Sequence, residues 1–253
     1  MKRIIQAACG CHIGKVRRNN EDNFWFAGKC LEVENCGLEC PVLFEDRIRD
    51  GLCIAVFDGM GGENFGEYAS YSAARRLQLA KRPFLNYFTC GEKAFEKLII
   101  QMNEAVVEVQ KKMLTCQMGT TMVGLYFFGR CVYVGNVGDS RAYRLREGEL
   151  LQLSLDHVAR RPNCENRKAA LSQYLGLDFD EVQIAPYIIK EEIRCGDVYL
   201  LCSDGLTDML TDLEIKRIID ESSDVDNCVR ELIHAALDRG GRDNVTVIVC
   251  KLL

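Results

Sequence analysis

One short stretch of this sequence constrains the fold most, because it ends a buried apolar run with an acid. Residues 52–57 read LCIAVF and are followed directly by Asp58 and a glycine-rich turn. A strand that is buried on both faces gains nothing from a carboxylate at its tip, unless a partner there offsets the free-energy cost of removing the charge from water. The sequence therefore predicts a buried strand whose end carries a binding group.

Four further apolar segments carry acid at one end in the same way. These segments and their acids are residues 132–137 with Asp139, residues 198–203 with Asp204, residues 245–249 with Asp243, and residues 23–26 with Glu21 and Asp22. A single Asp-Gly pair is common in hairpin turns, so one such acid alone would indicate little. The joint pattern favours convergence of the acids on bound divalent cations, because no neighbouring lysine in the sequence could pair with all of them.

The residue types favour a hard cation and a phosphate substrate. Only three histidines exist, and none lies beside the recurring acids: His12, His157 and His234. Carboxylate ligands suit Mg²⁺ or Mn²⁺ better than zinc or copper, and the cations relieve the repulsion that would otherwise raise the pKa values of crowded carboxyl groups. Two such ions, about 3.5–4 Å apart, can hold a shared water for in-line attack. Arg17, four residues before Glu21, is a natural phosphate clamp because guanidinium donates two parallel hydrogen bonds.

Length and composition are those of an ordinary globular protein. The 253 residues, 48% hydrophobic and 27% charged, predict a single domain over residues 1–253. A formal net charge of −5 gives no reason to expect a nucleic acid or an anionic membrane as a partner. No uncharged apolar run approaches the roughly 18 residues of a membrane span, and the apolar stretch at residues 4–9 is too short for a signal peptide. We expect a cytoplasmic protein, and we expect it to be a monomer.

The cysteines are numerous, at 14 in the chain. Several lie inside apolar runs, where a reduced thiol behaves as a small hydrophobic side chain: Cys53, Cys131, Cys202 and Cys250. This usage favours a reducing compartment. A zinc–thiolate site is an alternative for the cysteines near the N-terminus, although no pair among them has the usual C-x-x-C spacing: Cys9, Cys11, Cys30, Cys36 and Cys40.

The spacing of apolar residues predicts helix pairs that alternate with blocks of strands. Helical spacing occurs over residues 66–80 and 92–114. Thr211-Asp-Leu-Glu214 is a capping box that begins a third helix, and Ser223 is expected to cap a fourth that runs through Leu237. Strands are expected over residues 3–9, 23–27, 52–57, 120–128, 131–137, 141–145, 150–153, 187–193, 198–203 and 245–252, and a surface hairpin or insertion over residues 28–50. Hairpins in place of regular βαβ crossovers indicate an α+β fold, with two packed antiparallel sheets and a helix pair outside each.

Six short motifs occur in a fixed order along the chain. They are Gly14-x-x-Arg17-x-x-Asn20-Glu21-Asp22, Asp58-Gly59-Met60-Gly61-Gly62, Gly119-Thr120-Thr121, Asn136-Val-Gly138-Asp139-Ser140-Arg141, Asp204-Gly205-Leu206-x-Asp208 and Arg242-Asp243-Asn244-Val245-Thr246. With these motifs the chain resembles the metal-dependent protein phosphatase 2C family (PPM), of the bacterial type, along nearly its whole length. The resemblance implies the family's α-β-β-α sandwich, with the site in the cleft between the sheets.

The resemblance also implies a reaction and its metal ligands. The reaction is hydrolysis of phosphoserine and phosphothreonine in proteins by in-line attack of a metal-bridging water, without a covalent enzyme intermediate. Asp58 would bridge two Mn²⁺ or Mg²⁺ ions. Glu21 and the carbonyl group of Gly59 would bind one ion, while Asp204 and Asp243 would bind the other.

Further roles follow from the same resemblance. Asp139 and Asp204 would hold a third, looser ion that bacterial members contain. Asp22 would orient metal-bound water, and Arg17 would bind the phosphate of the substrate. The implied partners are phosphorylated proteins and a cognate serine/threonine kinase.

Two departures from the family pattern bear on the mechanism. Animal members place a histidine, proposed as the general acid, where this chain has Met60; bacterial members often have methionine there. The proton for the leaving oxygen would then come from water or from another group, for which His157 is a candidate. The flap before the L-x-x-x-L-G-like element at residues 171–176 is short, which bears on substrate selection and on the affinity for a third metal.

Two other interpretations of the site stay open. Cys11-His-Ile-Gly14-Lys-Val-Arg17 fits the C-x-x-G-x-x-R loop of cysteine-dependent phosphatases, but no helix follows to receive the loop and lower the pKa of the thiol. The chain could also be a catalytically silent phosphatase-like binding module, against which the complete set of acids argues.

A basic cluster is expected to be a solvated surface, with contact to a phosphopeptide as the alternative: Arg160, Arg161, Arg167 and Lys168.

Overall fold

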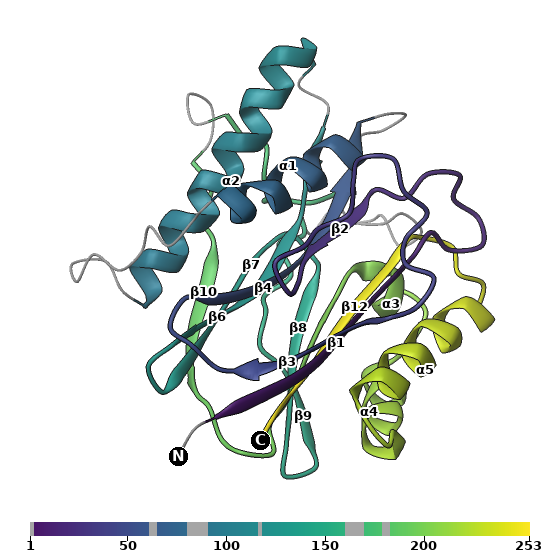
Figure 1. The fold of residues 1–253 in the computed structure, drawn as a ribbon. Coiled ribbons are helices and arrows are strands. Elements are labelled where there is room, and N and C mark those ends of the chain that lie inside the picture. The colour runs from purple at the N-terminus through teal and green to yellow at the C-terminus, as the bar shows by residue number, and fades with distance from the viewer. Residues whose placement is uncertain (1–2, 61–64, 80–90, 116–117, 160–169, 179–182) are drawn as a thin grey trace.

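The computed structural model describes residues 3–60, 65–79, 91–115, 118–159, 170–178 and 183–253. Within these residues, two antiparallel sheets pack face to face and helices cover both outer faces (Figure 1). This arrangement confirms the predicted α-β-β-α sandwich. The basic cluster at residues 160–168 lies outside the described residues.

The first sheet contains the strand whose end carries Asp58. Its order is β10 (Tyr187–Glu192), β7 (Cys131–Val137), β6 (Met122–Phe128), β4 (Leu52–Met60) and β2 (Asp22–Trp25), and the short β5 (Gly119–Thr120) pairs with the end of β4. The second sheet has the order β3 (Val42–Arg47), β1 (Ile4–His12), β12 (Val245–Leu252), β11 (Val198–Cys202), β8 (Arg141–Arg146) and β9 (Glu149–Gln152). The strand pairs recorded for both sheets are antiparallel, so the start of one strand meets the end of its neighbour at the same edge.

The helices form the outer layers. On the first sheet lie α1 (Gly66–Leu79) and α2 (Glu92–Met113), and on the second lie α4 (Asp212–Glu221) and α5 (Val225–Asp238). A Cβ atom at Gly10 of β1 would lie 2.6 Å from side-chain carbons of both Val229 and Ile233, so glycine at this position allows α5 to pack directly on the strand. A short helix, α3 (Asp204–Thr207), follows β11.

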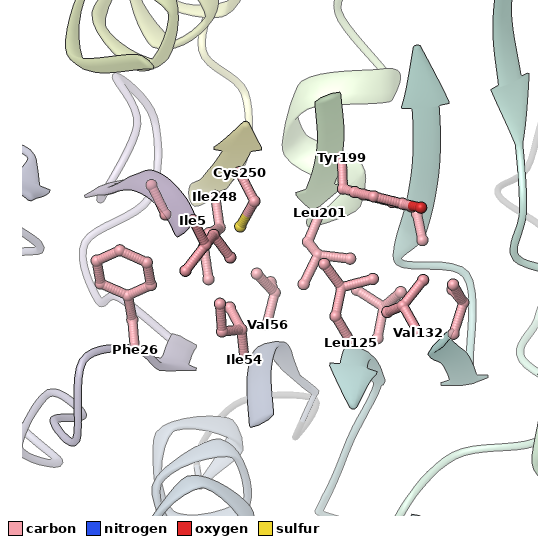
Figure 2. Packing of buried hydrophobic residues seen from close by; sticks show 14 of the residues in the cluster. Ile5, Phe26, Ile54, Val56, Leu125, Val132, Tyr199, Leu201, Ile248 and Cys250 are labelled. Carbon is pink, nitrogen blue, oxygen red and sulfur yellow. The ribbon is translucent and has the colours of Figure 1, made fainter. Parts of the chain in front are cut away.

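The apolar core has three layers, and β4 contributes to two of them. Ile54 and Val56 join the cluster between the sheets, whereas Ala55 and Phe57 face the layer of α1 and α2. Figure 2 shows Ile54 and Val56 pointing toward Ile248 of the opposite sheet. Burying a side chain of this size stabilises the fold by about 1.5–3 kcal/mol relative to leaving it exposed. The prediction that this strand is buried on both faces is therefore confirmed.

Most predicted elements agree with the structure, and three details differ. The capping box at Thr211 and Glu214 begins α4 as expected. The cap of α5 is Asp224 instead of Ser223, because the carboxylate of Asp224 accepts the backbone N–H of Asn227. Part of the expected insertion at residues 28–50 forms β3, an edge strand paired with β1. The short helix α3 was not predicted from the sequence. Among the described helices, none is long and apolar enough to cross a membrane.

Candidate active site

The predicted acids gather at one edge of the sandwich because of the antiparallel order. Asp22 begins β2 and lies opposite Asp58 near the end of β4. The backbone carbonyl of Glu21 accepts the N–H of Gly59 at 3.1 Å, and the backbone N–H of Glu21 donates to the side chain of Asn244 at 2.8 Å. Asn244 precedes β12 in the other sheet, so these bonds join the two sheets at the edge where the acids lie.

Two threonines after α2 fix the backbone of Asp58. The carbonyl oxygen of Asp58 accepts Thr120 Oγ1 at 2.9 Å and the N–H of Thr121 at 2.8 Å. The N–H of Asp58 donates to Thr121 Oγ1 at 3.1 Å. The G-T-T motif therefore holds the end of β4 in place.

Thr121 also contacts the turn that carries Asp139. Its Oγ1 lies 2.6 Å from the hydroxyl of Ser140, and its Cγ2 lies 2.6 Å from where a Cβ of Gly138 would be. Gly138 has a φ of +108°, which favours glycine over other residues. One threonine thus contacts both Asp58 and the residues on either side of Asp139.

Asp204 is brought to the same edge from the second sheet. It is the first residue of α3, and its neighbour Gly205 would clash with the backbone oxygen of Asn244 at 1.9 Å if it carried a Cβ. Ser203 and Thr246 are joined by two hydrogen bonds. The backbone N–H of Ser203 donates to the carbonyl oxygen of Thr246 at 3.1 Å, and the backbone N–H of Thr246 donates to Ser203 Oγ at 2.9 Å. The start of α3 therefore packs against the segment that follows Asp243.

Asp22 is buried, with 1% of its surface exposed. Its Oδ2 accepts the hydroxyl groups of Ser203 and Thr246, both at 2.7 Å. Its Oδ1 has no hydrogen-bond partner among the described residues. Burial raises the pKa of Asp22 to about 7, against the opposing effect of the two hydroxyl groups. A buried carboxylate oxygen without a partner indicates a site for a water molecule or an ion.

Arg17 faces the acids from the loop before β2. Its Nη2 donates to Asp243 Oδ2 at 2.7 Å, and 51% of its side chain is exposed. The hydrogen bond to Asp243 raises the pKa of Arg17 most, and the charges of Glu21 and Asp58 raise it further. The guanidinium group thus binds one predicted ligand, Asp243, and is accessible to a substrate.

Glu21 lies between the start of β2 and the N-terminus of α1. Burial raises the pKa of its carboxyl group, and the negative charge of Glu67 adds to the effect. A Cβ at Gly66 would lie 2.9 Å from Glu21 Oε2, and a Cβ at Gly59 would lie 2.3 Å from the oxygen of Gly66. The absence of side chains at these two glycines therefore lets strand, helix and carboxylate approach closely.

The oxygen atoms of the predicted ligands suit hard divalent cations, although the side chains are not arranged around a common metal position. Within the part of the chain that the structure describes, no three His, Cys, Asp or Glu side chains form a group that could hold an ion. The available donors are carboxylate oxygens, which Mg²⁺ and Mn²⁺ prefer. The unpartnered Oδ1 of Asp22 lies among them. The backbones of the predicted ligands converge, and their coordination roles stay a prediction.

The sequence did not assign roles to the polar residues that hold the acids in place. These residues all lie within or directly beside the recognised motifs: Thr121, Ser203, Asn244 and Thr246. The motifs therefore contained them, but did not indicate which hydrogen bonds they form with the acids and their neighbours. Thr121 lies 63 residues from Asp58 in the sequence, and Asn244 lies 223 residues from Glu21. Only the fold reveals these pairs.

The geometry argues against the two cysteine-based alternatives. Cys11 lies within β1, and burial raises the pKa of its thiol to about 12, the opposite of an activated nucleophile. Cys9 and Cys11 both belong to the core between the sheets, whereas Cys36 and Cys40 are exposed. The described cysteines do not form a thiolate group for zinc.

Known proteins resemble the chain in sequence and in fold. The family model described as protein phosphatase 2C matches residues 30–167. A serine/threonine phosphatase stp from Listeria innocua is 30% identical over 251 residues, which cover 93% of this chain and 91% of the relative. The crystal structure of the Mycobacterium tuberculosis serine/threonine phosphatase PstP/Ppp has a TM-score of 0.78 at 27% identity and covers 98% of both chains. The catalytic domain of PstP in complex with two manganese ions has a TM-score of 0.76 at 27% identity and covers 99% of both chains.

Proposed function

The chain belongs to the protein phosphatase 2C family, a family of phosphoprotein phosphatases, and from this premise we propose that it hydrolyses phosphoserine and phosphothreonine in proteins. One observation carries the proposal: acids from both sheets, remote in sequence, lie at one edge of the sandwich with an accessible arginine beside them. This arrangement combines a cation site with a group that binds phosphate.

We assign the metal ligands as the resemblance implies. Glu21, Asp58 and the carbonyl group of Gly59 would hold one Mn²⁺ or Mg²⁺ ion, and Asp58 would share the second with Asp204 and Asp243. Asp139 and Asp204 would hold a third, looser ion. When bound, these ions neutralise charge on the phosphate and lower the pKa of a water molecule for in-line attack. The two manganese ions in the similar PstP structure support a site for two such ions.

Arg17 would bind the phosphate. Its ion pair with Asp243 is partly exposed, with 51% of the Arg17 side chain and 27% of the Asp243 side chain accessible. Ion pairs at the surface are worth only about 0–1 kcal/mol, so a phosphate dianion can compete for the guanidinium group. Binding of a cation at Asp243 would release the guanidinium group for its substrate.

Asp22 would orient the attacking water. Ser203 and Thr246 hold its Oδ2, which leaves Oδ1 as the acceptor for a proton of that water. The side chain cannot turn away without losing two hydrogen bonds in a buried position. The same carboxylate is therefore positioned before the substrate arrives.

Phosphorylated proteins are the proposed substrates, and a serine/threonine kinase that produces them is the proposed counterpart. We also propose that residues 1–253 act as one catalytic domain, as a monomer in the cytoplasm. Size-exclusion chromatography with light scattering would test the monomer.

The test of the proposed function is hydrolysis of para-nitrophenyl phosphate and of a phosphothreonine peptide with Mn²⁺. We expect turnover that a chelator abolishes and that Asp58→Asn and Asp204→Asn remove. Alkylation of thiols should leave the activity in place, because Cys11 is buried. A folded chain that binds no Mn²⁺ and hydrolyses neither substrate would instead be a silent binding module.

A further inference from the structure

Hydrogen bonds join the turn that carries Asp139 to the segment that follows β9. Asn136 Nδ2 donates to the carbonyl oxygen of Leu155 at 2.7 Å, and its Oδ1 accepts the N–H of Leu155 at 3.0 Å. On the other side of the turn, Arg141 donates from Nε and Nη2 to the carboxylate of Asp156, with Nη2 at 2.7 Å from Oδ2. The segment is therefore fixed before and after Asp139.

His157, the next residue of this segment, binds both polar backbone groups of Gly138. The backbone N–H of His157 donates to the carbonyl oxygen of Gly138 at 2.9 Å. The N–H of Gly138 donates in return to His157 Nδ1 at 3.1 Å. Because Gly138 directly precedes Asp139, this reciprocal pair sets the direction in which the chain leaves the turn.

The bond from Gly138 defines the state of the imidazole ring. A nitrogen that accepts an N–H carries no proton, so the ring is neutral and its proton is on Nε2. Burial supports this state by lowering the pKa of His157, although the charge of Asp156 opposes it. A neutral ring held in this way accepts a backbone hydrogen bond at Nδ1, whereas the role of proton donor suggested by the sequence stays a prediction.

His157 also joins the turn to the base of the flap. Its carbonyl oxygen accepts the N–H of Ser172 at 2.9 Å, and Ala159 donates to Ala170 at 2.8 Å. The backbone segments at residues 157–159 and 170–172 are thus paired with each other. This pairing restrains the backbone of His157 independently of the bond from Gly138.

We propose that His157 is a positioning residue, which fixes the Gly138 turn through Nδ1 and so aims the carboxylate of Asp139 at the third ion. The inference rests on the proposed function, because the third ion belongs to it. Loss of the acceptor leaves a buried N–H without a partner and lets the turn rotate. The expected result is weaker binding of the ion that depends on Asp139, with the two other ions unaffected.

Two substitutions of similar polarity separate this role from proton donation. The Oδ1 of asparagine lies close to the position of Nδ1, whereas the Oε1 of glutamine reaches the position of Nε2. The test is therefore a comparison of His157→Asn with His157→Gln by calorimetric titration with Mn²⁺, together with kcat and KM on para-nitrophenyl phosphate. Unfolding midpoints without metal establish that both variants fold.

We expect His157→Asn to bind Mn²⁺ within about twofold of the wild type, and His157→Gln to weaken the looser binding step about tenfold, as loss of one buried hydrogen bond would. In an Asp139→Asn background, His157→Gln should add less than about twofold, because the two changes act on one site. Equal loss of kcat in both variants with unchanged Mn²⁺ binding would assign proton donation to His157 and overturn the proposal. Wild-type binding in His157→Gln would overturn it as well.

Two further results keep the test independent of variant folding and of the proposed function. The amide proton of Gly138 in the wild-type chain should be protected from exchange with solvent, and rapid exchange would contradict the hydrogen bond to His157. If the wild-type chain is active with Mn²⁺ and His157→Gln binds Mn²⁺ as the wild type does, only the positioning role of His157 is rejected. A wild-type chain that neither binds Mn²⁺ nor hydrolyses phosphate esters rejects the proposed function and this inference together.

Discussion

The two ends of β11 each contact a buried aspartate, and the two aspartates are satisfied in opposite ways. Asp197, which precedes the strand, and Asp22, which binds Ser203 after it, are both 1% exposed. Arg146 donates to both oxygens of Asp197, at 2.6 and 2.7 Å, and the N–H of Arg194 donates to it at 2.7 Å. Asp22 receives two hydroxyl groups on one oxygen and nothing from the described residues on the other.

The pKa values of the two aspartates are shifted in opposite directions. Burial alone would raise the pKa of Asp197, but the hydrogen bonds from Arg146 and Arg194 outweigh it and lower the pKa below its usual value. At Asp22 burial prevails and raises the pKa to about 7. A carboxylate with a complete set of partners stabilises the fold, whereas one with a free oxygen is available for chemistry.

The largest expected effect is on stability, at the Asp197 end. Arg146→Leu would leave Asp197 buried without its counter-charge and should lower the free energy of unfolding by about 3–5 kcal/mol in urea titrations. Activity per folded molecule should be unchanged, because the pair lies at the opposite end of β11 from the acids. Arg49→Leu is the matched control: its pair with Asp46 is exposed, and its loss should change stability by no more than about 1 kcal/mol. Equal effects of the two variants would contradict the division.

At the Asp22 end we expect a loss of activity with little loss of stability. Asp22→Asn keeps an acceptor for Ser203 and Thr246 but removes the negative charge, and kcat with Mn²⁺ should fall about 100-fold, which corresponds to about 2.7 kcal/mol. The free energy of unfolding without metal should change by less than about 1 kcal/mol. A variant that keeps wild-type kcat would remove Asp22 from the reaction.

The sequence predicted the edge of the sandwich better than the interactions that hold it together. Apolar runs bounded by turn signals were sufficient for β4 and β12, and the helical spacing of apolar residues was sufficient for the helix pairs, since local pattern determines these elements. The sequence predicts Ser223 as the cap of α5, but the cap is Asp224, because residues one position apart cannot be ranked without the backbone geometry. For the site, the motifs identified the acids. The pairing of Thr246 with Asp22 spans 224 residues and depends on sheet packing, which no local pattern encodes.

The pH dependence of stability should follow Asp197. Because its folded pKa is depressed, its contribution is present above the unfolded value of about 3.9 and is lost as the pH falls through the folded pKa. Asp197→Asn should therefore be less stable than the wild type at pH 6 by about 2 kcal/mol, and this difference should shrink at pH 3. Glu32→Gln, at an exposed position, serves as a control and should show no such convergence. A difference that stays constant from pH 6 to pH 3 would mean that Asp197 has the same pKa in the folded and the unfolded chain, which would contradict the depressed pKa.

The smallest expected effect concerns the hydroxyl group that fixes Asp22. Thr246→Val keeps the shape of a buried β12 side chain but removes the donor to Asp22 Oδ2, and should lower the free energy of unfolding by about 1 kcal/mol. Because the carboxylate then keeps only Ser203 as a partner, kcat should fall several-fold while KM for para-nitrophenyl phosphate stays close to that of the wild type. Thr246→Ser retains the hydroxyl group and should recover most of the lost kcat, even though it removes a methyl group from the core. If valine and serine lowered kcat equally, packing at this position would matter and the hydrogen bond would not, and the rigid placement of Asp22 would then have to come from Ser203 alone.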